Sequence, residues 1–135
     1  MVTDHSPDSK EMMLFGKIMH LHTFSDDFLS EVRIRRIWYS CSFLQATIIK
    51  NQVQNSIGYL CWGMFNKESI LILKHFETWP IYNYEWNEGN IPTLVDLFIL
   101  QRYRKQFTSK ILQTVKNISS SKIFIPNKNC FKNGS

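Results

Sequence analysis

The feature that most constrains this chain is a continuous apolar run over residues 94–100, in which the only charged residue is Asp96. The run follows a turn-forming segment at 87–90, and its length and composition predict a buried β-strand over 93–99. A carboxylate inside such a strand costs free energy unless it has a hydrogen-bond partner or an opposite charge. The rest of the fold therefore has to supply a partner for Asp96.

Composition narrows the class of protein. The chain has 135 residues, of which 44% are apolar, so it can build the core of one compact domain. Its net charge of +5 favours an acidic partner, which leaves nucleic acid, anionic lipid and acidic proteins open. The three cysteines have no close spacing, which fits a reducing cytoplasm better than a disulfide framework or a zinc site. We therefore expect a cytoplasmic protein with no bound metal.

Two further expectations concern membranes. No apolar run approaches the ~20 residues that a membrane span needs. Residues 1–8 are polar and acidic, unlike a signal peptide. We expect no membrane span.

Hydrophobic periodicity gives the order of the elements. We expect helices over 9–22 and 29–44, a β-hairpin of 45–50 and 57–62, the strand 93–99, a helix from Leu100 to the serines at 119–121, and a last strand over 122–125. Residues 69–76 fit either a strand or a short helix. The domain is expected over 9–125, between a flexible leader (1–8) and a polar tail (126–135). This order predicts a single-domain α/β fold, with a mixed sheet flanked by helices.

The candidate catalytic residues start from Asp96. Its carboxylate either orients a catalytic imidazole, as in a triad, or lies at a strand edge, where it is solvated or forms an ion pair with a nearby arginine. His20 and His22 end the first predicted helix, where a helix C-terminus favours the protonated imidazole. They are either solvent-facing or, if Asp96 reaches one of them, a general base. His75, inside an apolar run, is expected in the core.

Two other stretches carry alternatives. The aromatic loop 79–86 fits a wall for an acyl chain, a platform for stacking bases, or a loop packed on itself. The basic stretches 33–36 and 102–105 fit solvated helix faces or, if they share one side, a docking patch for an acidic protein. A small nucleic-acid binder rests on these two features alone, and we do not expect nucleic acid as the partner.

Three segments resemble the toxin-activating lysine acyltransferases, which acylate internal lysines of hemolysin-type RTX protoxins. Residues 15–21, followed by Ser25, are similar to the family's opening helix and its serine. Residues 57–63 are similar to a strand that ends in Trp-Ala. Trp86, Gly89 and Asp96 keep the spacing from the family's Asp-Trp-x-x-Gly motif to its catalytic Asp. Together the segments span most of 14–107.

The resemblance implies an acetyltransferase-like (GNAT-like) fold and an activity. Members of the family take a fatty acyl group from acyl carrier protein and pass it to a lysine side chain in the cytoplasm. They need no bound cofactor, because the acyl carrier protein is the donor substrate. Acyl carrier protein is acidic, which would give the net charge of +5 a use.

The chain departs from the family at the catalytic histidine. The family's His lies three residues after the Ser, and that position here is Phe28. A phenylalanine ring cannot accept a proton, so acid–base catalysis needs another residue. We expect His22 as the base, with His20 as the other candidate, Asp96 as the residue that orients it and Ser25 as a helper.

A divergent branch of the family supports a different hypothesis. Its relative matures siderophore microcins, working with a partner protein on a precursor peptide. By analogy, this chain would be a non-catalytic or complex-dependent subunit that presents a microcin precursor peptide. A hetero-complex or a homodimer fits this branch.

Overall fold

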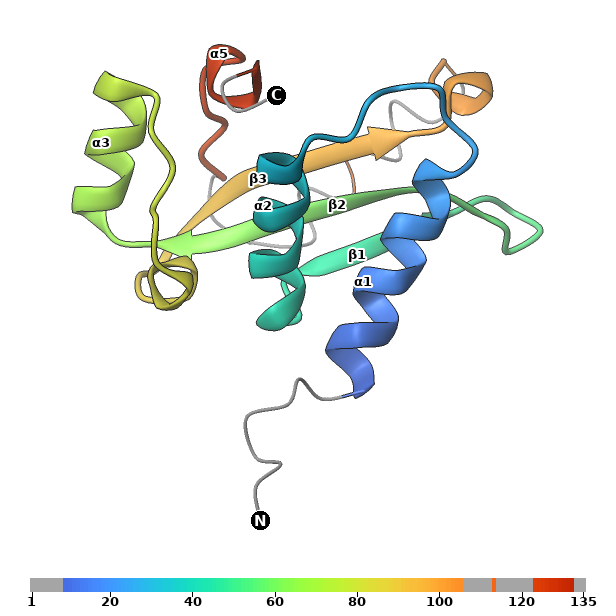
Figure 1. Cartoon of the computed structure of the whole chain (residues 1–135), viewed down its shortest axis with the longest axis horizontal. Coiled ribbons are helices and arrows are strands. Elements are labelled where there is room, and N and C mark those ends of the chain that lie inside the picture. The colour runs from blue at the N-terminus through green and yellow to red at the C-terminus, as the bar shows by residue number, and fades with distance from the viewer. Residues whose placement is uncertain (1–8, 106–112, 114–122, 133–135) are drawn as a thin grey trace.

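The centre of the computed structural model, which describes residues 9–105, 113 and 123–132, is a three-stranded antiparallel sheet (Figure 1). Strands β1 (Ala46–Lys50), β2 (Ser56–Phe65) and β3 (Ile91–Ile99) lie in the order β1-β2-β3. The strand 93–99 is thus confirmed as part of β3. The α/β class is also confirmed, but these three strands are antiparallel rather than mixed.

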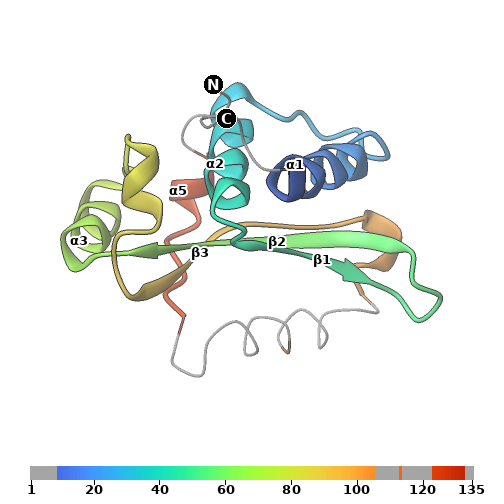
Figure 2. The same cartoon turned by 90° about the horizontal axis from the view of Figure 1, so that it is seen from below.

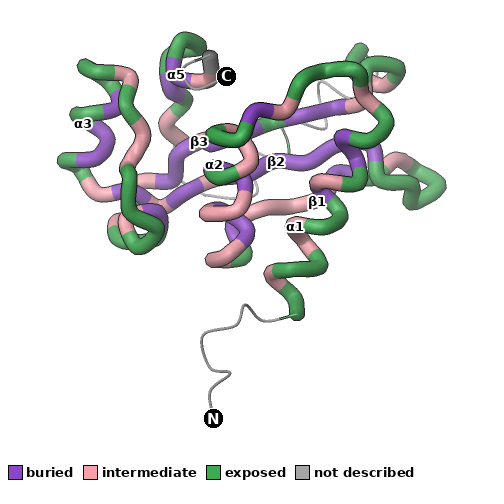
Figure 3. Tube along the Cα trace, viewed as in Figure 1, coloured by how far each residue is buried: buried purple, intermediate pink, exposed green. Residues whose placement is uncertain are grey.

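Two helices cover one face of this sheet. Helices α1 (Ser9–His22) and α2 (Glu31–Ser42) lie side by side on the same side of the strands (Figure 2). Residues three or four apart lie on one helix face, and this spacing selects the residues that are buried. On α1 these are Ile18, Leu21 and His22, and on α2 they are Arg36, Ile37, Ser40 and Cys41. The buried residues of β2 and β3 complete the core (Figure 3).

The ambiguous run 69–76 is helical and lies within α3 (Lys67–Phe76). The side chain of Asn66 caps the helix by accepting a 2.8 Å hydrogen bond from the backbone N–H of Ser69. Glu77 ends it in the left-handed conformation, with φ of 53°. Ile70 and Leu73 are buried while Leu71 and Ile72 are exposed, which is helical and not strand-like alternation. The expected loop that follows contains the 3-10 helix η2 (Asn83–Trp86).

The C-terminal region is described in part. The expected helix from Leu100 begins as the 3-10 turn η3 (Gln101–Tyr103), and its stretches 106–112 and 114–122 lie outside the described residues. Phe124, in the expected last strand, forms a parallel bridge with Thr93 of β3. In the expected polar tail, α5 (Asn129–Lys132) places Cys130 in the core with no exposed surface.

The described part of the chain forms one small α/β domain with four α-helices. None of the described helices combines the length and the apolar character that crossing a bilayer requires.

Candidate functional site

The Asp96 carboxylate has two hydrogen-bond partners, which come from α2 and β2. The carboxylate is 4% exposed and faces α2, whose Arg33 donates to it through Nε at 3.1 Å and through Nη2 at 3.2 Å. The hydroxyl of Tyr59 on β2 donates to Oδ2 of Asp96 at 2.5 Å. The buried carboxylate is therefore both ion-paired and hydrogen-bonded, which removes most of the cost of its burial.

The geometry of α2 explains how Arg33 reaches the sheet. Ser30 caps the helix by accepting a 3.1 Å hydrogen bond from the backbone N–H of Arg33. This cap fixes the first turn, so Arg33 lies on the same helix face as Arg36 and Ile37, both of which are buried. The expected solvated basic face is therefore wrong for Arg33 and Arg36, and of this arginine cluster only Arg35 is exposed.

His22 joins the same group through Tyr59. It is the last residue of α1, is buried, and lies one turn after the buried Ile18. Its Nε2 is 2.7 Å from the Tyr59 hydroxyl, and its ring lies 4.3 Å from that of Phe98. The His22–Tyr59–Asp96 chain therefore connects α1, β2 and β3, with Tyr59 between the two residues that the sequence singled out.

The positions of the protons follow from counting donors. Tyr59 has one hydroxyl proton, which it donates to Asp96. Its oxygen must then accept the hydrogen bond from His22, so the proton of the neutral imidazole is on Nε2. The other nitrogen, Nδ1, is buried and has no hydrogen-bond partner in the structure. His22 thus carries its free lone pair on Nδ1.

The pKa directions agree with this arrangement. Burial lowers the pKa of His22 and the nearby charge of Arg33 lowers it further, against the opposite effects of Asp96 and Asp27. Burial, together with the charge of Asp96, raises the pKa of Tyr59, which keeps its proton at neutral pH. Burial alone would lower the pKa of Arg33, but Asp96 outweighs it and the pKa is raised. The expected protonated histidine at this helix end is therefore corrected to a neutral one.

Asp96 also lines a cavity of about 380 Å³. The other lining residues are Phe28, Ser30, Arg33, Leu94, Leu97 and Phe131. Phe28, where the resemblance predicts a histidine, thus lines the same cavity as Asp96 and is 82% exposed. The Phe28 side chain cannot take part in proton transfer.

The remaining predicted residues lie elsewhere. The Ser25 hydroxyl accepts a 3.0 Å hydrogen bond from the backbone N–H of Asp27 and does not contact Asp96. His20 is exposed and packs edge-on against Phe24 at 5.1 Å. His75, expected in the core, is exposed on α3 because that segment is a helix. Among the described residues no three His, Cys, Asp or Glu side chains are grouped to hold a metal ion.

The alternative of an ion pair between Asp96 and an arginine is confirmed, with Arg33 as the arginine, but the sequence did not single out Arg33, and the role of Tyr59 was not expected. Tyr59 was read only as part of the similar segment 57–63, and Arg33 as part of a basic face. One signal was available: Ser30, three residues before Arg33, is a helix-capping residue type, and it sets which side of α2 faces the sheet.

Comparison with known proteins adds no relative. A scan against protein-family models found no match for the chain, and a search of curated proteins found no matching sequence. The resemblance to the toxin-activating acyltransferases therefore stays a prediction from three sequence segments.

Proposed function

We propose that this protein is an acyltransferase of acetyltransferase-like (GNAT-like) fold, which moves a fatty acyl group from acyl carrier protein to a lysine of a protoxin or to a related peptide acceptor. The observation that supports this proposal is the His22–Tyr59–Asp96 chain, which leaves Nδ1 of a neutral imidazole without a hydrogen-bond partner. A general base needs this form of histidine, uncharged and with an open lone pair.

In the proposed step, Nδ1 of His22 accepts a proton from the acceptor amine or hydroxyl. The freed nucleophile attacks the thioester carbonyl carbon, a new N–C or O–C bond forms, and the C–S bond breaks. The imidazolium then returns its proton to the leaving sulfur. Tyr59 and Asp96 act as positioning residues, because they hold the imidazole with its proton on Nε2 and stabilise its charged form.

The test uses acyl carrier protein loaded with a radiolabelled acyl chain, incubated with the protein and with a protoxin fragment or a microcin precursor peptide. His22→Gln should lower the rate by at least about 100-fold, the low end for loss of a general base. Asp96→Ala should lower it as much, since the imidazole loses the group that orients it. His75→Gln is the matched control and should leave the rate unchanged. Full activity of His22→Gln would reject the catalytic assignment.

The burial of the His22 imidazole favours a second, non-catalytic function. Nδ1 of His22 is buried, and the exposed residues that line the cavity beside Asp96, Phe28 and Leu97, have side chains that cannot transfer a proton. We therefore also propose, as the alternative, a non-catalytic or complex-dependent subunit that presents a siderophore-microcin precursor to a partner. If acylated product forms in the same assay with no partner beyond acyl carrier protein and the acceptor, this protein is not a purely presenting subunit. Product that forms only when a partner is added supports it.

A further inference from the structure

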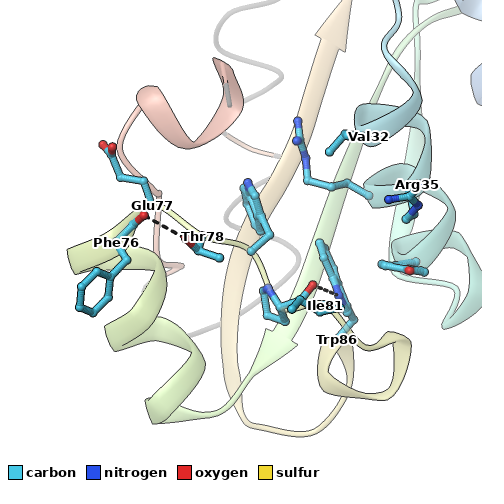
Figure 4. A pocket seen from close by; sticks show the side chains of 11 residues that line it. Val32, Arg35, Phe76, Glu77, Thr78, Ile81 and Trp86 are labelled. Atoms are coloured by element: carbon cyan, nitrogen blue, oxygen red, sulfur yellow. Dashed lines mark hydrogen bonds between the residues drawn. The ribbon is translucent and has the colours of Figure 1, made fainter. Parts of the chain in front are cut away.

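A second cavity, of about 540 Å³, lies between α2 and the loop that follows α3 (Figure 4). Val32 and Arg35 of α2 lie on one side of it, Glu77 and Thr78 on the other, and Trp86 between them. Much of the wall is aromatic: Trp79 and Trp86 stack at 5.7 Å with 14° between their planes. The volume is in the range of small-molecule sites. It is separate from the cavity beside Asp96, with which it shares no lining residue.

One charged residue of this cavity is buried without a hydrogen-bond partner. Arg36 lines the cavity and is 3% exposed, and its three guanidinium nitrogens make no hydrogen bond in the structure. The guanidinium carbon lies over the face of Trp79, 5.4 Å from the ring centroid, which compensates part of the charge. An arginine keeps its charge at all ordinary pH values, so this burial is costly unless an anion completes the site.

The neighbouring charged side chains leave the Arg36 guanidinium available to bind an anion. The nearby carboxylate of Asp96 is taken by Arg33. Arg35 is half exposed and is 3.7 Å from Glu31 on the same helix. Since Arg35 pairs with Glu31, Arg36 is the guanidinium of this lining that has no hydrogen-bonded carboxylate, and it presents a single unpaired positive charge. A single excess charge in an apolar cavity matches a monoanion better than a phosphate dianion.

We propose that this cavity binds a small organic carboxylate with a flat, apolar body. The carboxylate accepts two parallel hydrogen bonds from the Arg36 guanidinium, the geometry in which arginine and carboxylate pair best. The body lies against the half-buried ring of Trp79, which is backed by the buried ring of Trp86.

Calorimetric titration of the full chain tests this with three probes: 2-naphthoate, its neutral analogue 2-naphthamide, and inorganic phosphate. We expect 2-naphthoate to bind with a Kd of about 1 mM or tighter, and the amide and phosphate each at least about tenfold more weakly. Equal binding of the acid and the amide would overturn the role of the charge. Tighter binding of phosphate would overturn the role of the apolar wall.

Variants then locate the site. Arg36→Met keeps the apolar bulk and should weaken naphthoate binding at least about tenfold, with no change for the amide. The matched control is Arg102→Met, an exposed arginine outside the cavity, which should bind naphthoate as the natural chain does. Unchanged binding in Arg36→Met would overturn the assignment. If that variant does not fold, the comparison of acid and amide on the natural chain decides.

Discussion

One hydrogen-bonded group contains a side chain from each of α1, α2, β2 and β3. Its members are His22, Arg33, Tyr59 and Asp96. Arg33 of α2 donates to both carboxylate oxygens of Asp96, and Tyr59 of β2 donates to Oδ2, so the group also holds the helices against the sheet. Breaking a buried ion pair by removing one partner typically costs about 3–5 kcal/mol. Substitutions of Asp96 therefore affect stability as well as activity, and gentler changes separate the two.

Tyr59→Phe removes one oxygen from the middle of this group. Nε2 of His22 and one oxygen of Asp96 then lose a hydrogen bond inside the core, for which we expect a loss of about 1–3 kcal/mol in the free energy of unfolding. Urea denaturation measures it. The control Tyr84→Phe removes an exposed hydroxyl and should stay within about 0.5 kcal/mol of the natural chain. Equal effects of the two substitutions would mean that the Tyr59 hydroxyl is not bonded as described.

His22 should make stability depend on pH. Its pKa is lowered in the folded state, so below about pH 6.5 the unfolded chain binds a proton that the folded protein does not. The free energy of unfolding should therefore fall as the pH drops from about 6.5 toward the folded-state pKa of His22, and this contribution should be constant above that window. Denaturation curves of His22→Gln should lack this part of the pH dependence. The exposed control His75→Gln should retain it.

At the scale of elements, Gly89 joins the turn before β3 to the end of β2. Its backbone N–H donates a 3.0 Å hydrogen bond to the carbonyl of Met64, and a Cβ on Gly89 would overlap the backbone carbonyl of Phe65. The spacing of Trp86, Gly89 and Asp96 thus has a structural basis. Trp86 is fully buried, Gly89 permits the close turn, and Asp96 then falls on the face of β3 that α1 and α2 cover.

We expect Gly89→Ala to lower the free energy of unfolding by about 1–3 kcal/mol, the usual cost of forcing extra atoms into a packed site. Gly16 gives the matched comparison, because nothing lies within 4 Å of the position of its Cβ and it is inside α1. Gly16→Ala should raise stability by about 0.5–1 kcal/mol, since alanine favours the helix. If Gly89→Ala has the same free energy of unfolding as the natural chain, this turn is not tightly packed against β2.

The elements that the sequence predicted well are those with strong periodicity. The helix expected over about 9–22 is confirmed, and strand 93–99 lies inside β3. Run 69–76 stayed ambiguous because four successive apolar residues fit both periods, and the cap at Asn66 decided it. Asp96 was singled out correctly as a buried charge. An arginine was expected among its partners, but neither Arg33 nor Tyr59 could be named, because the choice depends on which helix face meets the sheet, and that is a tertiary property.

At the scale of the whole molecule, the C-terminal α5 closes the core beside α3. The indole N–H of Trp79 donates to the backbone carbonyl of Cys130 at 2.9 Å, and Phe131 packs on the Trp79 ring. Residues about fifty positions apart in the sequence are thus packed together. The three cysteines all have no exposed surface, but only Cys130 lies on a helix as short as four residues.

Thiol labelling should distinguish Cys130, on the short helix α5, from Cys41 and Cys61. Burial raises the pKa of the Cys61 and Cys130 thiols, so both react slowly in the folded protein. We expect Cys130 to be labelled first, by local opening of α5, while Cys41 and Cys61 react at the rate of global unfolding. Mass spectrometry after timed alkylation distinguishes the three sites. Labelling of all three at one rate would instead show that α5 opens only together with the rest of the domain.

The measurement that tests the His22–Tyr59–Asp96 chain most directly is nitrogen-15 NMR of the His22 ring at neutral pH. We expect a neutral imidazole with its proton on Nε2 and an unprotonated Nδ1, because Tyr59 donates to Asp96 and accepts from His22. Tyr59→Phe should remove this preference between the two nitrogens. A proton on Nδ1, or a charged ring at pH 7, would contradict both the geometry and the proposed general base.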